Sequence, residues 1–330
     1  MDIADLLALS VNHGASDLHL SAGVVPMLRI DGDMQRCDLP VLEAGQVRGL
    51  VQGVMSEAQR RRFEAQLEAD FAYALPGLGR FRVNVFEQQR GPGAVFRRIA
   101  ETVPSLESLG LGDVFSQLCQ APHGLVLITG ATGSGKTTTL AAMIDHLNRT
   151  RQRHILTLED PIEFIHPPRQ SLISQREVHR HTHSFAAALR SAMREDPDVI
   201  MLGEMRDLDT IRLALTAAET GHLVFATLHT SSAAKTIDRM VDVFPGDEKA
   251  MVRAMLSESL LAVVSQTLVK KAGGGRVAAH EIMLATPAIR HLIRENKVAQ
   301  MVSAIQTGAA VGMQTLEMGL NRLREQGLTQ

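Results

Sequence analysis

The sequence predicts an α/β protein in which a small mixed unit precedes a nucleotide-binding core, and three observations predict it. The segment Gly130–Thr137 has the pattern G-x-x-x-x-G-K-[ST] and stands between the apolar run Leu125–Ile128 and a helical stretch, Thr138–Asn148. From about Gly112 onward, strand-like and helical patterns alternate, which is typical of a mostly parallel sheet covered by helices. Residues 1–100 mix short strands and helices without that alternation.

The first hundred residues contain candidates for helices and strands in mixed order. Ile3, Leu6, Leu7 and Val11 fall on one face of the first predicted helix. Further helices are predicted over residues 43–54 and 57–66, and strands over 17–21, 27–30, 71–75, 80–87 and 94–99. Residues 101–112, with Pro104 and two glycines, are predicted to link this unit to an ATPase domain over 113–330.

The remainder of the chain has the strand–helix rhythm of a parallel sheet. Strands are predicted over 125–129, 154–158, 172–175, 199–203 and 223–228, with helices over 184–194 and 208–219. After Ser231 the chain is predicted to be mainly helical, interrupted at Lys270–Arg276, and its last part, about 271–330, is predicted to be C-terminal helices. Ligands of such sheets bind at the carboxyl ends of the strands.

Composition excludes several classes of protein. A net charge of −2 and an aromatic content of 3% offer little to nucleic acid, which binds basic grooves and stacks on aromatic rings. The two cysteines, Cys37 and Cys119, are too far apart in sequence for a zinc or disulfide motif and favour a reducing compartment. The acidic N-terminus lacks a signal-peptide pattern, and no apolar run reaches about 18 residues. A cytoplasmic protein without zinc is expected.

The glycine-rich segment predicts a site for ATP or GTP. In such a loop, backbone N–H groups and the N-terminus of the following helix point at phosphate oxygens. Lys136 is expected to reach the β- and γ-phosphates, and the Thr137 hydroxyl to bind Mg²⁺. The predicted nucleotide-binding residues are Gly130, Ala131, Thr132, Gly133, Ser134, Gly135, Lys136, Thr137 and Thr138.

Two groups of carboxylates follow predicted strands and are candidates for hydrolysis. Glu159, Asp160 and Glu163 come directly after one strand, and Glu204 after another. A standard Walker B strand ends in Asp, and here Gly203 occupies that place. We therefore expect Thr137 to hold most of the metal contact, with Glu204 or Glu163 acting through water. The sequence leaves open which of these two takes the proton from water.

Histidines and arginines supply further candidates, each with a plainer alternative. His222 and His229 flank the predicted strand 223–228, where they either sense the γ-phosphate or only form hydrogen bonds at strand ends. Arg82 and Arg97 lie on strand-like runs, where they either decorate an exposed face or act on the nucleotide of a neighbouring subunit.

Further segments make the pattern more specific than a phosphate loop alone. Together with Gly130–Thr137, the chain resembles the secretion-type ATPases and, within them, the type IV pilus retraction ATPases (the PilT family). The resemblance covers nearly the whole chain and rests on Gly14–Leu20, Glu159–Glu163, Arg194–Asp198, Gly203–Asp207, Thr216–His222, Thr227–Thr230 and Ala288–Glu295. In this family the residue at the place of Gly203 is not the usual Asp, and the atypical Walker B glutamate corresponds to Glu204.

The resemblance implies a PAS-like N-terminal domain, a RecA-like core and ATP hydrolysis at the subunit interfaces of a homohexamer. It makes His222 and His229 a histidine box and gives Arg82 and Arg97 the role of the N-terminal-domain arginines. It implies an inner-membrane pilus platform protein and a paralogous retraction ATPase as partners, at the cytoplasmic side of the pilus base. It makes a family motif of Ala288, Ile289, Arg290, His291, Leu292, Ile293, Arg294 and Glu295, with His291 where Asn is expected. The apolar spacing of this segment is that of an amphipathic helix, which either couples ATP turnover to the machinery or only packs against the core.

The alternatives differ in how well the sequence opposes them. Extension and type II secretion ATPases typically carry a four-cysteine zinc element, which two cysteines cannot form. A RecA-like nucleic-acid translocase is opposed by the acidic balance, and a nucleotide-gated scaffold by the intact Lys136, Thr137, Glu163 and Glu204. The alternative that the chain is an accessory retraction ATPase stays open, because such a protein shares the core motifs.

Overall fold

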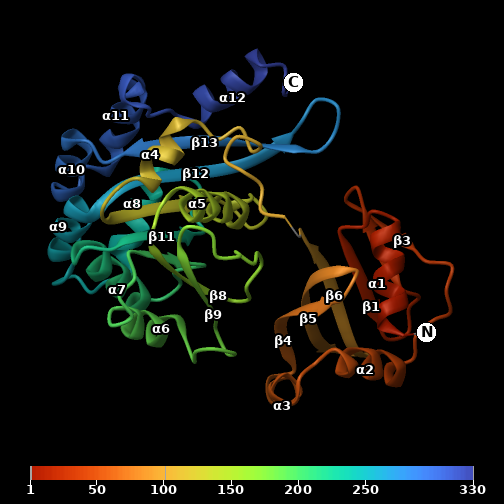
Figure 1. Ribbon diagram of the computed structural model, residues 1–330. Helices are drawn as coiled ribbons and strands as arrows, with labels where there is room; N and C mark the ends of the chain where they lie inside the picture. The colour runs from red at the N-terminus through yellow and green to blue at the C-terminus, as the bar shows by residue number, and fades with distance from the viewer. Residues whose placement is uncertain (1, 101, 330) are drawn as a thin grey trace. The chain divides into compact units, whose positions relative to one another are not determined.

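The computed structural model describes residues 2–100 and 102–329, and the chain forms two compact units (Figure 1). The first unit contains the residues up to Thr102 together with Pro161–Ile165. The second contains Val103–Asp160 and His166–Gln330. The chain therefore passes from one unit to the other at residues 102–103, 160–161 and 165–166.

An antiparallel sheet of six strands forms the first unit, in the order β3-β2-β1-β6-β5-β4. Its core contains the large side chains Phe81 and Phe96, which are 1% exposed. The predicted helices and strands are present. Strand β3 was not predicted, because its four residues are all exposed and do not alternate between apolar and polar side chains. The elements are α1 (Ile3–Asn12), α2 (Ala44–Gly53), α3 (Glu57–Gln66), β1 (Asp17–Ser21), β2 (Met27–Ile30), β3 (Asp33–Arg36), β4 (Glu68–Leu75), β5 (Gly79–Gln88) and β6 (Gly91–Ile99).

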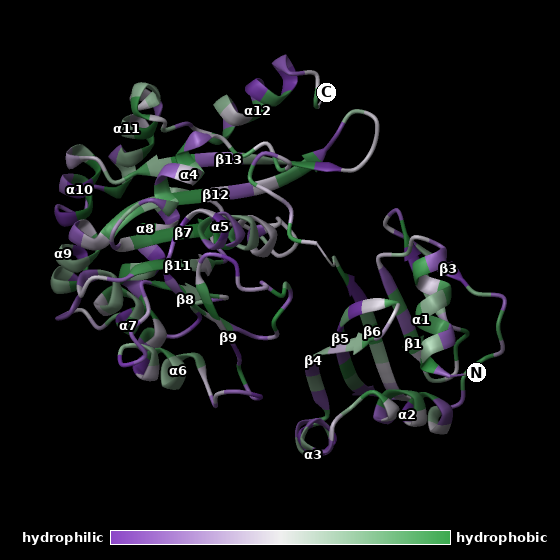
Figure 2. Cartoon of the chain, viewed as in Figure 1, coloured by the Kyte–Doolittle hydropathy of each residue, from purple (hydrophilic) through white to green (hydrophobic). Residues whose placement is uncertain are grey.

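The second unit is built on a sheet of seven strands in the order β13-β12-β7-β11-β10-β8-β9. All neighbouring strands are parallel except the edge strand β13, which runs antiparallel to β12. Figure 2 shows the central strands as apolar, as expected for strands covered on both faces. The strands are β7 (Gly124–Thr129), β8 (His154–Glu159), β9 (Leu172–Glu177), β10 (Val199–Leu202), β11 (Leu223–Leu228), β12 (Leu260–Lys270) and β13 (Arg276–Leu284).

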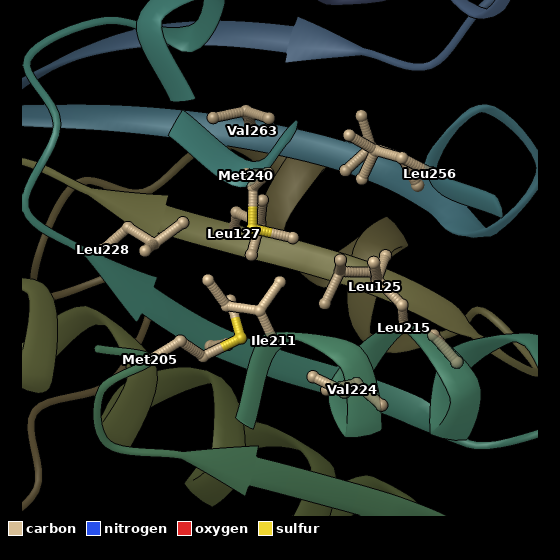
Figure 3. Close-up of a cluster of buried hydrophobic side chains, with 14 of the residues drawn as sticks. Leu125, Leu127, Met205, Ile211, Leu215, Val224, Leu228, Met240, Leu256 and Val263 are labelled. Atoms are coloured by element: carbon tan, nitrogen blue, oxygen red, sulfur yellow. The ribbon is translucent and has the colours of Figure 1, made fainter. Parts of the chain in front are cut away.

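Helices cover both faces of this sheet, and alternate residues of β7 show the two layers. Leu125 and Leu127 belong to one buried cluster (Figure 3), whereas Val126 and Ile128 belong to the other. The first cluster is completed by helices α6 to α11 and the second by α4 and α5. The helices are α4 (Asp113–Cys119), α5 (Lys136–Thr150), α6 (Phe185–Ala192), α7 (Leu208–Glu219), α8 (Ala233–Asp242), α9 (Lys249–Ser259), α10 (Pro287–Arg294), α11 (Met301–Thr307) and α12 (Leu316–Glu325).

The structure corrects two expectations about the connections of the chain. The region after Ser231 contains more helix than strand, but β12 and β13 form an antiparallel hairpin that was not predicted, and the C-terminal helical part begins at Pro287 rather than 271. The predicted linker over 101–112 is shorter than expected. Leu106 and Leu111 are 3% and 8% exposed and pack into the core of the second unit, whereas residue 101 lies outside the described residues.

Among the described helices the longest, α5, has 15 residues, and none combines the length and apolarity that crossing a bilayer requires.

Candidate functional site

The phosphate loop lies between the end of β7 and the start of α5, as predicted. Its glycines adopt left-handed backbone angles that other residues avoid, with φ of 144° at Gly130, 78° at Gly133 and 88° at Gly135. Gly135 caps α5 without any side-chain hydrogen bond, so the first N–H groups of the helix are not capped by a side chain. This geometry fits an anion such as a nucleotide phosphate.

Strand β12 passes close to two of these glycines. A Cβ atom on Gly130 would lie 2.3 Å from the backbone oxygen of Gln266 and 2.6 Å from Ser134 Oγ, and one on Gly135 would lie 2.8 Å from Gln266 Nε2. By contrast, a Cβ atom on Gly133 would have no neighbour within 4 Å. Steric exclusion by β12 therefore requires glycine at positions 130 and 135.

We expect Gly130→Ala to lower both nucleotide affinity and stability, by about 3 kcal/mol of unfolding free energy, because strain and overpacking act together. Gly133→Ala is the matched control, with only backbone strain of about 1 kcal/mol. Thermal unfolding and ADP titration of both variants measure the difference. Equal effects of the two substitutions would contradict the role given to β12.

Lys136 is buried at the start of α5, with its charge held inside the loop. Its Nζ donates to the carbonyl oxygens of Gly130, at 2.8 Å, and Ala131, at 2.9 Å. Burial lowers the pKa of Lys136, and the nearby Glu204 carboxylate opposes that shift. Lys136 and Glu204 are therefore close enough for their charges to interact.

Glu204 follows β10 and forms two charged contacts. Its Oε1 lies 3.0 Å from His229 Nε2, and its Oε2 lies 2.8 Å from Arg206. Burial acts to raise the pKa of Glu204, but the hydrogen bonds and charges of Arg206 and His229 outweigh it and hold the pKa below its ordinary value. Glu204 is therefore an ionised carboxylate at neutral pH, able to orient water or accept a proton.

The glycine in the Walker B position packs closely against the end of β8. A Cβ atom on Gly203 would lie 3.3 Å from the backbone oxygen of Leu158 and 3.4 Å from the Cα of Glu159, at the end of β8. Glu159 itself is buried and accepts a hydrogen bond from Thr157 Oγ1 at 2.6 Å. A side chain at position 203 would therefore fit only tightly against the end of β8, and the carboxylate at this strand end comes from the next residue, Glu204.

Glu163 occupies a different environment from that expected of a metal ligand. It belongs to the segment Pro161–Ile165, which the structure groups with the first unit. Its carboxylate lies 3.3 Å from Arg82, and its backbone oxygen accepts a hydrogen bond from Arg80 at 2.7 Å. The structure thus brings Glu163 together with Arg82.

Strand β11 separates His222 from His229. His229 follows its last residue and reaches Glu204, whereas His222 precedes its first residue and its Nδ1 lies 3.0 Å from the backbone oxygen of Ala217. A strand of six residues spans about 20 Å at about 3.3 Å per residue. Of these two histidines, His229 therefore lies at the phosphate-loop end of the sheet and His222 at the opposite end, and a γ-phosphate-sensing role of His222 stays a prediction.

Arg82 and Arg97 are direct cross-strand neighbours on β5 and β6. Like charges in such a pair repel, and carboxylates on both sides offset the repulsion. Arg82 contacts Asp70 at 2.9 Å, and Arg97 contacts the buried Asp17 at 2.7 Å. The two predicted arginines therefore share one face of the first sheet, with Asp17 on one side of the pair and Asp70 on the other, an arrangement that the sequence analysis did not anticipate.

The predicted coupling segment coincides with helix α10, and its two faces differ. Ile289, Leu292 and Ile293 are buried in the core, whereas Ala288, His291, Arg294 and Glu295 are exposed. Arg290 donates to the backbone oxygens of residues 257, 258 and 260, at the C-terminal end of α9, and to that of Ala285, just before α10. Arg290 thus caps α9, where unsatisfied carbonyls would otherwise remain.

Two side chains with oxygen donors are candidates for holding Mg²⁺ together with bound phosphate. Within residues 2–100 and 102–329, no group of three or more His, Cys, Asp or Glu side chains could hold a metal ion. Mg²⁺ commonly takes one or two protein ligands plus phosphate oxygens and water. The hydroxyl of Thr137 in the first turn of α5 and the carboxylate of Glu204 are oxygen donors that fit this requirement.

Comparisons with known proteins agree with this architecture. Residues 3–275 match the family model described as type II/IV secretion system protein. The chain is 66% identical over 328 residues to the type IV pilus retractation ATPase PilT of Pseudomonas aeruginosa, covering 99% of this chain and 95% of that protein. It is 60% identical over 304 residues to a twitching motility protein of Neisseria gonorrhoeae, covering 92% and 81% of the two chains.

Two further similarities bear on function and fold. The type IV pilus ATPase PilU of Pseudomonas aeruginosa is 42% identical over 328 residues, covering 99% of this chain and 86% of that protein. A crystal structure of the pilus retraction motor PilT with bound ADP is 47% identical, with a TM-score of 0.91, and covers 100% of this chain and 95% of that one. The chain belongs to the type II/IV secretion system protein family.

Proposed function

We propose that this chain is an ATPase motor that powers retraction of type IV pili. The observation that carries the proposal is 66% identity to a pilus retraction ATPase across nearly the full length. The site supports it, because a complete phosphate loop, Lys136, Glu204 and His229 meet at the carboxyl end of one sheet. Identity to the type IV pilus ATPase PilU is lower, at 42%, so the retraction ATPase PilT is the better guide to the role of this chain.

The chain's own residues supply the elements of ATP hydrolysis. The N–H groups of the loop and the Lys136 ammonium bind and neutralise the phosphates. Glu204, ionised and hydrogen-bonded to His229, orients the attacking water and accepts its proton, and His229 lies where it can sense the γ-phosphate. Mg²⁺, held by Thr137 and through water by Glu204, would neutralise charge on the β- and γ-phosphates. Because Glu163 is engaged by Arg82, Glu204 is the better candidate for the general base.

We assign the first unit as a PAS-like domain and the second as a RecA-like core. In the proposed homohexamer, Arg82 and Arg97 of one subunit reach the nucleotide bound by the neighbouring subunit. His222 of the same subunit is proposed to reach that nucleotide as well. Hydrolysis can drive movement only if ATP and ADP differ in affinity for two domain arrangements. The expected partners are the inner-membrane platform protein at the cytoplasmic side of the pilus base and a paralogous retraction ATPase.

Helix α10 is proposed to couple ATP turnover to the pilus machinery through its exposed face. We expect His291→Ala combined with Glu295→Ala to leave ATPase activity within about twofold of wild type while abolishing twitching, because neither residue is buried. Surface changes of this kind typically alter stability by less than about 0.5 kcal/mol. ATPase assays and twitching assays on the same variant measure the two effects.

Arg290→Ala provides the contrast within the same helix. It uncaps α9 and should lower stability by about 2 kcal/mol, reducing activity and movement together. If the variant with both exposed residues replaced loses hydrolysis as well, α10 serves packing alone.

The proposed function is tested by deleting the gene in its own cells and imaging pili. Retraction function predicts that pili still assemble but no longer shorten, and that the wild-type gene restores shortening. Cells without pili would indicate an extension or secretion role instead.

A further inference from the structure

A buried glutamine on β12 joins the phosphate loop to the edge of the sheet. Gln266 is 2% exposed, and the register Ser265↔Thr129 places it level with Gly130 at the end of β7. Its Nε2 donates to the backbone oxygen of Ser134 at 2.6 Å. Its Oε1 accepts from Thr139 Oγ1 at 2.8 Å, on the second turn of α5.

These contacts fix the orientation of the Gln266 amide. The carbonyl oxygen of Ser134 can only accept a hydrogen bond, so the amide nitrogen must face it. The amide oxygen then faces Thr139 and His280, whose Nε2 lies 3.3 Å away. A flipped amide would set two oxygens against each other at the loop, in a buried site where such a mismatch is costly.

The orientation of the Ser134 carbonyl determines the direction of the Gly135 N–H, the donor on the opposite side of the same peptide. A trans peptide is planar, and its C=O and N–H groups point in opposite directions. When Gln266 holds the Ser134 oxygen toward β12, the N–H of Gly135 points away from β12. The N–H groups of a phosphate loop are the groups that meet its ligand.

A series of contacts links Gln266 to the C-terminal part of the chain. His280 is the direct partner of Gln266 across β12 and β13, and its ring packs edge-on against Phe115 at 5.3 Å. Burial lowers the pKa of His280 to about 4, so the ring is neutral at pH 7. Its backbone oxygen accepts from Gln314 at 2.9 Å, just before α12.

We propose that Gln266 is a positioning residue for the reaction: its amide holds the Ser134–Gly135 peptide so that the Gly135 N–H faces the nucleotide phosphates, and His280 holds that amide in place. This inference rests on the proposed function, since the ligand of the loop is taken to be ATP or ADP. Gln266 touches no reacting atom itself. Its effect is on binding through the loop that it supports.

The test compares Gln266→Met, which keeps the side-chain length but removes the hydrogen bonds, with Gln117→Met, an exposed glutamine on α4. Full-length chains are titrated with ADP and assayed for KM and kcat with ATP, and their thermal midpoints are measured without nucleotide. Gln266→Met should raise the ADP Kd and the ATP KM about tenfold, about 1.4 kcal/mol, with kcat within about twofold. Gln117→Met should match wild type.

A second variant keeps the inference testable if Gln266→Met does not fold. His280→Phe retains the ring against Phe115 and removes only the hydrogen bond to Gln266, and it should raise the ADP Kd about threefold. A lower thermal midpoint with an unchanged ADP Kd in these variants would mean a purely structural role and overturn the inference. The wild-type chain separates the two levels: if it neither binds ADP nor hydrolyses ATP, the proposed function fails, whereas normal ADP binding by Gln266→Met and His280→Phe beside an active wild type overturns only the positioning role.

Discussion

Lys136→Ala is expected to abolish ATP hydrolysis and to leave the fold intact. The ammonium group is the positive charge that the loop itself supplies against the phosphates, and it is buried where charge interactions are strong. We expect kcat/KM to fall by at least about a thousandfold, which corresponds to about 4 kcal/mol of transition-state stabilisation. Steady-state ATPase assays and ADP titration measure the loss.

Lys136→Met is the matched control, because methionine keeps most of the aliphatic stem and removes only the charge. We expect it to unfold near the wild-type temperature and to be as inactive as Lys136→Ala. Substantial ATP hydrolysis by the methionine variant would show that the Lys136 charge is not part of the site.

Glu204→Gln is expected to separate nucleotide binding from turnover. The amide has nearly the shape of the carboxylate and can still accept a hydrogen bond from Arg206 or His229, but it cannot accept the proton of water. ADP affinity should stay within about threefold of wild type, whereas kcat should fall at least about a hundredfold. Single-turnover assays with ATP, alongside ADP titration, distinguish the two effects.

Glu163→Gln is the comparison that decides between the two candidate bases. The structure pairs Glu163 with Arg82 in the first unit, so its loss should lower kcat less than the loss of Glu204 does. A larger fall in kcat for Glu163→Gln than for Glu204→Gln would reverse the assignment.

The parts of the fold that follow from local pattern were predictable. Strands β7 and β11 are continuous apolar runs bounded by glycine or histidine, and both fall within a residue of the predicted positions. The phosphate loop carries its own geometry, because its glycines and lysine are required at fixed spacing. Even the separation of His222 from His229 was available in the sequence, since a strand of that length places its two ends on opposite edges of the sheet.

Features that depend on contacts between distant segments were not predictable. Leu260–Lys270 is an apolar run whose pattern does not distinguish a strand from a buried helix, and its pairing with β7 spans more than a hundred residues. Gln266 belongs to no motif, and only the register of β12 brings it to the loop. Glu163 was expected as an alternative to Glu204 at the metal, but its contacts are made with Arg80 and Arg82, about eighty residues earlier in the chain.

The central claim is that ATP hydrolysed at the Lys136–Glu204 site of this chain shortens pili. Time-lapse imaging of labelled pili in cells whose only copy of the gene carries Glu204→Gln tests it most directly. The account predicts pili that extend and do not retract, although the variant is present at the wild-type level and binds ADP. Retraction at the wild-type speed in those cells would contradict it.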